Sequence, residues 1–130
     1  MNIDTFPSIA AGAQAKYPEY AAHMRDLHAR RYKTVAAAND AGVPIYLGTD
    51  AGGSLPHGLV AHEAAELVSA GLSTIEVLTA ASWGARAWLR KPGLVEGASA
   101  DLIVYQADPR TDIGVLAAPG HIVLRGVVVT

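Results

Sequence analysis

Cysteine is absent from the 130 residues of the sequence, and this absence excludes three kinds of site. Without thiolates the chain cannot form disulfides, use a cysteine nucleophile or hold zinc through sulfur. Any metal ion must therefore bind through oxygen or imidazole ligands. Because the sequence has no cysteine, it does not indicate whether the protein folds in an oxidising or a reducing compartment.

Positive charge is also scarce. Ten Lys and Arg stand against twelve Asp and Glu, the formal net charge is -2, and no basic run extends beyond Arg30-Arg31. A protein that follows a nucleic-acid backbone needs a basic surface to neutralise phosphates. We therefore expect no nucleic-acid partner.

Long apolar runs are missing as well, although 51% of the residues are hydrophobic. No run approaches the roughly 20 residues that a membrane-spanning helix requires. The N-terminal segment lacks the cationic start and the continuous apolar core of a signal peptide. The composition suits one folded unit with a core of its own, and we expect it in the cytoplasm without membrane association.

Hydrophobic periodicity predicts helices over residues 18–41, 59–70 and 73–89. The last of these begins with Ser73-Thr74-Ile75-Glu76, the pattern of a capping box. The segment from Val43 to Thr49 is too short for a helix and too apolar for a half-exposed strand. It predicts a strand covered on both faces, as in parallel sheets flanked by helices.

The pattern changes near residue 91, where Lys91-Pro92-Gly93 interrupts the helical periodicity. The remaining sequence alternates short β-branched runs with Gly, Pro and Asp, and Arg125-Gly126 fits a two-residue hairpin turn. We therefore predict two parts, a helical and strand-containing part over residues 1–90 and a β-rich part over residues 91–130.

Asp50 is the first candidate functional residue, because it follows the predicted buried strand and precedes Gly52 and Gly53. In folds built from β/α units, residues at the carboxyl end of a strand face the crevice where ligands bind. A carboxylate there is costly to desolvate unless it is paired or holds a metal. The alternative is that Asp50 caps a turn or the next helix; the adjacent glycines, which let a backbone approach a ligand closely, favour function.

Histidines follow Asp50 at positions 57 and 62. His57, in the loop Pro56-His57-Gly58, is the better candidate to face the same crevice and contact a substrate. The competing interpretation for both is an ordinary surface or helix-capping imidazole.

Three known motifs are incomplete in this region. A zinc-protease helix needs a second histidine four residues after His62, where the sequence has Glu66. The glycine-rich run GTDAGGS lacks the lysine of a phosphate-binding loop. Ser54 lies in no G-x-S-x-G elbow, which argues against a hydrolase triad with His57 and Asp50.

A series of short motifs nevertheless follows the order seen in one enzyme family. They are Ala41-Gly42-Val43-Pro44-Ile45, Gly48-Thr49-Asp50-Ala51-Gly52, His57-Gly58, Glu66-Leu67, Ala70-Gly71-Leu72-Ser73, Leu78-Thr79-Ala80-Ala81-Ser82, Gly93-Leu94-Val95, Ala100-Asp101-Leu102-Ile103-Val104, Asp108-Pro109 and Val123-Leu124-Arg125-Gly126-Val127-Val128-Val129. In this combination the chain from about residue 40 onward resembles the C-terminal part of metal-dependent amidohydrolases, in the branch of imidazolonepropionases and Xaa-Pro dipeptidases.

The resemblance implies an α/β fold, namely the last β/α units of a (β/α)8 TIM barrel followed by part of a small β-sandwich domain. It also implies that Asp50 follows the eighth barrel strand, contacts a catalytic divalent metal such as zinc, and takes a proton from the metal-bound water. A divalent cation lowers the pKa of bound water from about 15.7 to about 7, so a nearby carboxylate is a competent acceptor at neutral pH.

The rest of the family's ligand set has no counterpart. The family takes a His-x-His pair, a Lys or Glu, and further histidines from earlier strands, and none of the five histidines here falls on a matching position. A complete barrel needs about 250 residues, whereas residues 1–90 can supply only the last one or two units. We therefore expect a C-terminal fragment in which residues 1–4 end the seventh strand and residues 18–41 form its helix.

The sequence thus predicts part of a hydrolase that cleaves C–N bonds in a small amide, cyclic amide or dipeptide, with an incomplete metal site and no activity as an isolated chain. The alternative is a non-catalytic fragment that oligomerises or associates with another chain. Its open sheet edges would favour pairing with a second copy or with a missing N-terminal part.

Overall fold

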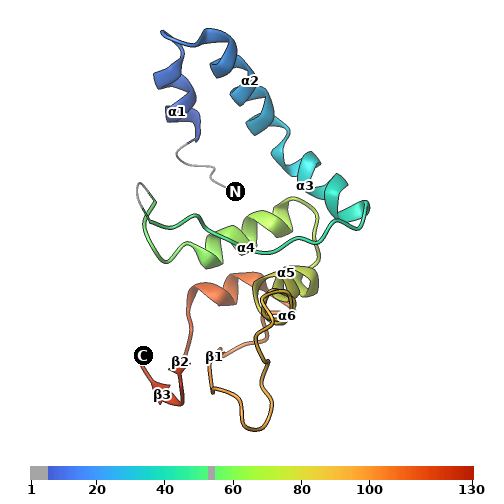
Figure 1. Ribbon diagram of the computed structural model, residues 1–130, viewed down its shortest axis with the longest axis vertical. Helices are drawn as coiled ribbons and strands as arrows, with labels where there is room; N and C mark the ends of the chain where they lie inside the picture. Colours follow the sequence, from blue (N-terminus) through green and yellow to red (C-terminus); the bar gives the residue numbers. More distant parts are fainter. Residues whose placement is uncertain (1–5, 53–54) are drawn as a thin grey trace.

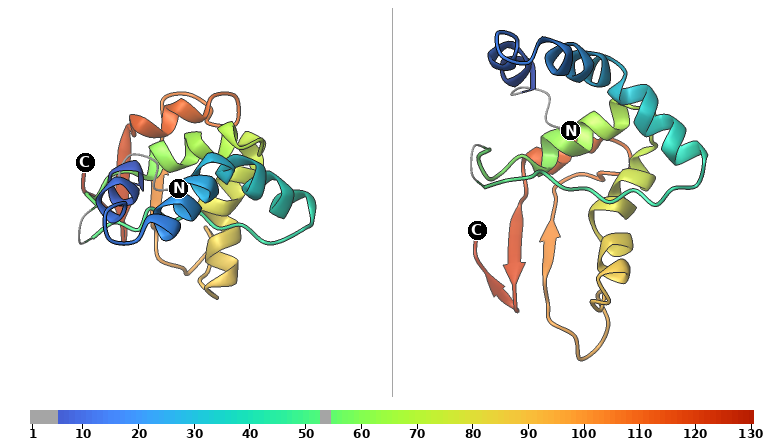
Figure 2. Two further views of the ribbon diagram at one scale, coloured as in Figure 1. Left: turned by 90° about the horizontal axis from the view of Figure 1, so that it is seen from above. Right: turned by 45° about the horizontal axis from the view of Figure 1, so that its top comes forward.

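The computed structural model describes residues 6–52 and 55–130. Figures 1 and 2 show a helical hairpin at one end, a central group of helices crossed by an extended segment, and a small sheet at the other end. The predicted strand end at residues 1–4 lies outside the described residues.

The helical hairpin consists of α1 (Phe6–Ala13) and α2 (Pro18–Ala29). Pro18 suits the first turn of α2, where the amide that proline lacks would have no partner. Ala10 and Ala21 are almost completely buried, and their small side chains let the two helices approach closely. The hydrophobic periodicity predicts no helix before residue 18, so α1 is an addition to the prediction.

The predicted helix over residues 18–41 is two helices. After α2 the chain continues as α3 (Arg31–Asp40), and the break falls at Arg30, whose φ of -103° and ψ of 9° leave the helical range. The prediction of one continuous helix was wrong, because the pattern of apolar residues runs through Arg30 without interruption.

The central helices are α4 (Val60–Ser69), α5 (Thr74–Ala81) and α6 (Trp83–Trp88). Helix α4 ends just before Gly71, as predicted, and Gly71 begins the turn to α5 with a φ of 106°. The predicted helix over residues 73–89 is interrupted at Ser82, where φ is -133° and ψ is -99°. The capping box is confirmed: the Glu76 amide donates to the Ser73 hydroxyl, and the Ser73 amide donates to the Glu76 carboxylate.

The hydrophobic core lies between α4, α5 and the 3-10 helix η1 (Ile113–Ala117). Its buried members are Ala64, Leu67, Ala70, Leu72, Val77, Leu78 and Ile113. Ile113 is contributed by the C-terminal part of the chain, so this part and the helices share one core. The division at residue 91 remains a prediction.

The described strands form a three-stranded antiparallel sheet of β1 (Leu102–Val104), β2 (His121–Leu124) and β3 (Val127–Val128). Arg125 and Gly126 connect the last two strands with φ values of 51° and 79°, which is the geometry of the predicted two-residue hairpin. Several apolar side chains of this sheet and of the residue after it remain more than half exposed: Leu124, Val127, Val128 and Val129.

The segment 43–49 forms no strand ladder in the described part of the chain. Instead, residues 43–49 run as an extended segment alongside α4 (Figures 1 and 2), and Val43 is 52% exposed. The prediction of a strand covered on both faces is therefore wrong for this chain. A parallel strand needs neighbouring strands, and no other described segment pairs with it. The barrel to which the prediction assigned it remains untested.

No helix within residues 6–52 and 55–130 is long and apolar enough to cross a membrane.

Candidate functional site

The extended segment begins directly after α3, where Gly42 takes a φ of 73° and the Val43 amide donates to the carbonyl of Ala38 over 3.0 Å. Along the segment, Ile45 and Leu47 pack against the core, whereas Tyr46 between them and Gly48 after them are exposed. This alternation is the two-residue period of extended chain. The segment therefore has one face on the core and one open face.

Two contacts attach the extended segment to helices α5 and α6. The Leu47 amide donates to the carbonyl of Ala80 at 3.1 Å, and the Tyr46 ring stacks on the indole of Trp88. Both contacts lie within four residues of Asp50. They hold the chain that leads to the candidate carboxylate.

Asp50 lies where the extended segment ends. Its side chain is exposed, and its φ of 55° is in the left-handed region, which Asp tolerates better than most residues. Gly52 follows with a φ of 116° and pairs with Leu55 in an isolated antiparallel bridge. The carboxylate is thus presented at a chain reversal, open to solvent in the described structure.

His57 lies in the connection between this bridge and α4, and its side chain is exposed. Within the described residues no hydrogen bond joins His57 to Asp50. Gly53 and Ser54, which lie between the two residues in the sequence, are outside the described residues. The substrate contact of His57 therefore stays a prediction.

The residues present do not complete a metal site. Among residues 6–52 and 55–130, no three His, Asp or Glu side chains are grouped closely enough to hold an ion. Glu66, the residue in the place of the second zinc-protease histidine, accepts a hydrogen bond of 2.6 Å from the hydroxyl of Tyr32. This hydrogen bond is the main cause of the raised pKa of Tyr32.

Glu63, which follows His62 in the incomplete zinc-protease pattern, is a buried acid. It is 8% exposed and lies in the first turn of α4, where the partial positive charge of the helix N-terminus stabilises a carboxylate. Its position four residues before the buried Leu67 was a usable signal, because residues at i and i+4 share one helix face.

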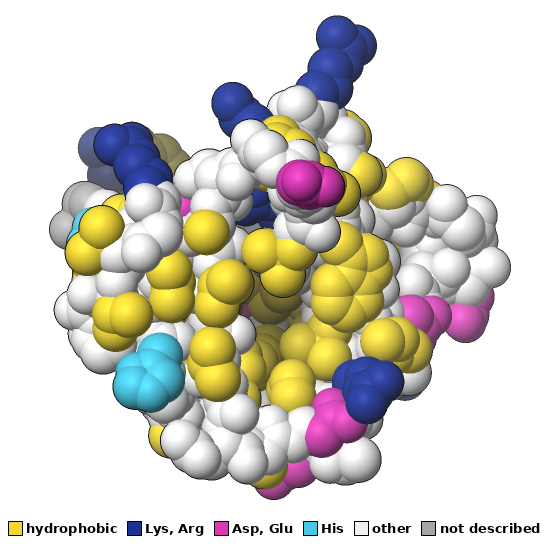
Figure 3. All heavy atoms as spheres, turned by 90° about the horizontal axis from the view of Figure 1, so that it is seen from below, with side chains coloured by type: hydrophobic (Ala, Val, Ile, Leu, Met, Phe, Trp, Pro, Cys, Tyr) yellow, Lys and Arg dark blue, Asp and Glu magenta, His cyan; other side chains and the backbone are white. Residues whose placement is uncertain are grey.

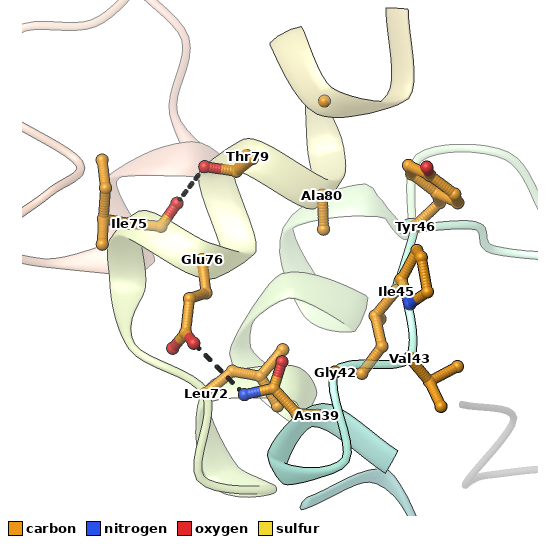
Figure 4. Close-up of a pocket in the computed structure, with 12 residues that line it drawn as sticks. Asn39, Gly42, Val43, Ile45, Tyr46, Leu72, Ile75, Glu76, Thr79 and Ala80 are labelled. Carbon is orange, nitrogen blue, oxygen red and sulfur yellow. Dashed lines mark hydrogen bonds between the residues drawn. The ribbon is translucent and has the colours of Figure 1, made fainter. Parts of the chain in front are cut away.

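A cleft of about 390 Å³ separates the start of the extended segment from α5. Figure 4 shows Val43, Ile45 and Tyr46 on one side and Ile75 and Thr79 on the other.

At one end of this cleft, Asn39 and Glu76 point toward one another, and the amide of Asn39 donates to Glu76 at 3.2 Å. The hydrogen bonds from Ser73, followed by the one from Asn39, lower the pKa of Glu76. Its carboxylate therefore serves the helix cap and the link to α3.

Proteins similar to this chain are about three times as long. No protein-family profile matches the chain. Uncharacterized proteins of Mycobacterium tuberculosis and Mycobacterium bovis are 54% identical to it over 126 residues, which cover 97% of this chain and 34% of theirs. The chain thus spans about a third of the length of these curated relatives.

Solved structures are similar to nearly the whole chain. A Xaa-Pro dipeptidase with methionine bound in its active site has a TM-score of 0.75 at 24% identity, over 95% of this chain and 32% of its own. The A. niger ochratoxinase has a TM-score of 0.72 at 28% identity, over 97% and 30%. A prolidase complexed with N-methylphosphonate-L-proline has a TM-score of 0.67 at 24% identity, over 97% of this chain and 33% of its own.

These neighbours are amidohydrolase-like hydrolases, so the resemblance inferred from the sequence is confirmed at the level of the fold. Because the chain covers about a third of each of them, its fold corresponds to a part of such an enzyme. The expectation of a fragment fits this coverage.

Proposed function

We propose that this chain is the C-terminal part of a metal-dependent amidohydrolase that hydrolyses C–N bonds in a small amide, cyclic amide or dipeptide. The observation that carries the proposal is the match of nearly the whole chain to about a third of a Xaa-Pro dipeptidase and of an ochratoxinase. The ordered sequence motifs from about residue 40 onward resemble the same family and support the proposal.

Asp50 is the residue to which we assign a role. In the proposal its carboxylate contacts the divalent metal, zinc by resemblance, and acts as the base. Its position at the end of the extended segment, with an exposed side chain and positive φ, supports this assignment. His57 is proposed as a substrate contact from the same connection.

The described residues do not fit a complete metal site, since no group of three potential ligands is found among them. We therefore assign no catalytic step to a metal in this chain alone. Further ligands would have to come from another part of a longer polypeptide or from another chain. The isolated chain is then expected to be inactive, and its cytoplasmic location remains a prediction.

Calorimetric titration of the purified chain with zinc, together with assays on Xaa-Pro dipeptides and aromatic amides, tests this picture. We expect weak zinc binding and no turnover. Tight binding of one zinc ion per chain, or hydrolysis by the chain alone, would contradict the proposal that most ligands are missing.

A second candidate function is association without catalysis. It is favoured by the open face of the extended segment and by the exposed apolar side chains of the sheet, which a stable monomer seldom leaves uncovered. Size-exclusion chromatography with light scattering tests it: we expect self-association, and a monomer over a wide concentration range would argue against this function.

A further inference from the structure

A second cleft lies away from Asp50, between the end of α5, α6 and the C-terminal part of the chain. Its volume of about 480 Å³ falls in the range of roughly 300–1,000 Å³ that is typical of small-molecule sites. Its apolar lining includes Val60, Leu78, Trp83, Ile103 and Leu116. Seen from below, the molecule is hollowed at this end, and hydrophobic side chains gather around the hollow (Figure 3). Neither Asp50 nor His57 lines this cleft.

Trp83 is the largest side chain of the lining and is 50% exposed. The other tryptophan, Trp88, stacks on Tyr46, but within the described residues Trp83 stacks on no aromatic ring. An indole on the wall of a cleft offers a flat apolar surface to a planar ligand. This surface favours aromatic rings, which gain from offset stacking as well as from burial.

Tyr105 supplies a polar group on the same cleft. Its side chain is partly buried, and burial raises the pKa of its hydroxyl. A tyrosine hydroxyl keeps its proton at neutral pH and can donate it in a hydrogen bond. Within residues 6–52 and 55–130 this hydroxyl forms no hydrogen bond. A partly buried hydroxyl without a protein partner is favourable only if water or a ligand completes its hydrogen bonds.

The charged residues of the cleft neutralise one another. The Arg110 guanidinium donates from Nη2 to Oδ2 of Asp108 at 2.6 Å and from Nε to Oδ1 at 3.0 Å. The pair lies at the lining together with Pro109. Asp108 and Arg110 are the charged residues in the described lining, and because they are paired with each other, this lining offers no unpaired charge to an ionic ligand.

We propose that this cleft binds an uncharged, planar aromatic molecule, which lies against the indole of Trp83 and forms a hydrogen bond with the hydroxyl of Tyr105. The site is separate from Asp50, and the proposal does not depend on the proposed hydrolase activity.

N-Phenyl-1-naphthylamine, an uncharged dye that fluoresces in apolar sites, is the probe for a direct test. We expect saturable binding of one dye molecule per chain. Trp83→Leu should weaken this binding at least tenfold, whereas Trp88→Leu, the matched control outside the cleft, should change it less than twofold. Equal effects of the two substitutions, or binding of many dye molecules, would overturn the proposal.

Displacement of the dye tests the polar contact. Tyr105→Phe should weaken displacement by 1-naphthol by about threefold and leave displacement by naphthalene unchanged, because only 1-naphthol carries a hydroxyl. For the unsubstituted chain, 1-naphthoate should displace the dye less effectively than 1-naphthol. This comparison stays informative if Trp83→Leu fails to fold, which circular dichroism would show. An equal effect of Tyr105→Phe on both competitors, or stronger displacement by 1-naphthoate, would contradict the proposed contacts.

Light scattering during the titration distinguishes another occupant of the cleft. We expect the dye to bind with the same affinity at all protein concentrations. Loss of dye binding as the chain self-associates would show that a second copy covers the cleft, and the small-molecule proposal would then be wrong.

Discussion

The ring of Tyr46 stacks on the indole of Trp88, with centroids 4.9 Å apart and an angle of 24° between the planes. The contact joins the extended segment that leads to Asp50 to helix α6. Trp88 is 64% exposed. The stack on Tyr46, rather than burial in the core, is therefore what fixes its side chain against the rest of the chain.

A double-mutant cycle should therefore detect coupling between these two residues. We expect Tyr46→Ala and Trp88→Ala to be coupled by about 0.5–1.5 kcal/mol in the free energy of unfolding, as measured by urea denaturation. The same cycle with Tyr46→Ala and Trp83→Ala should be additive. Additivity of the first pair would show that the stack does not hold the segment.

Gly84 in α6 is required for a close approach of the backbone. A Cβ atom at this position would lie 2.7 Å from the carbonyl oxygen of Thr79 and 2.9 Å from its Cγ2. Gly84→Ala should therefore destabilise the chain by about 1–3 kcal/mol, although alanine is the better helix former. The measurement is the midpoint of thermal or urea unfolding.

Gly12 in α1 provides the matched control, since a Cβ there would meet no atom within 4 Å. Gly12→Ala should stabilise the chain by about 0.5–1 kcal/mol through helix propensity. If both substitutions had the same sign, the crowding at Gly84 would not be the cause.

The capping box of α5 should make stability depend on pH in acid. The pKa of Glu76 is lowered below its usual value of 4.5, first by the hydrogen bonds from Ser73 and then by that from Asn39. A carboxyl with a lowered pKa in the folded state contributes stability that is fully present above about pH 4.5 and is lost as the pH falls through the folded-state pKa. We expect the free energy of unfolding to decrease over this window.

Glu76→Gln and Ser73→Ala should each reduce this decrease, because the first removes the titrating group and the second its main hydrogen-bond partner. The decrease should not vanish, since the backbone amide of Arg125 and the side chain of Arg110 lower the pKa of Asp101 and Asp108 respectively. Ser69→Ala, within α4, should retain the pH dependence of the unsubstituted chain. An unchanged dependence in Glu76→Gln would refute the assignment.

Features set by neighbouring residues were predictable from the sequence. The capping box, the end of the helix at Gly71 and the turn at Arg125-Gly126 each depend on a few adjacent residues, and the structure confirms all three. The helix breaks at Arg30 and Ser82 were not predicted, because the apolar periodicity continues across both residues. Near Ser82, Gly84 was the one local signal of a break.

Features that depend on distant residues were harder to predict. The segment 43–49 has the composition of a buried strand, but a strand forms only where a partner lies beside it, and composition does not report the partner. Prediction of the candidate metal site has the same limit, because its ligands come from distant parts of a chain. The sequence identifies Asp50 by its position after an apolar segment, whereas the described residues contain no further group that would complete a metal site.

The most direct measurement of the central claim uses a chimera. The chain would replace the matching third of the 54% identical M. tuberculosis relative, so that the remaining two thirds supply the rest of the polypeptide. We expect the chimera with zinc to hydrolyse a Xaa-Pro dipeptide or an amide, and Asp50→Asn to lower kcat/KM at least a thousandfold. Asp40→Asn, an exposed acid at the end of α3, is the control and should have no effect. Full activity of the Asp50→Asn chimera would contradict the role proposed for Asp50.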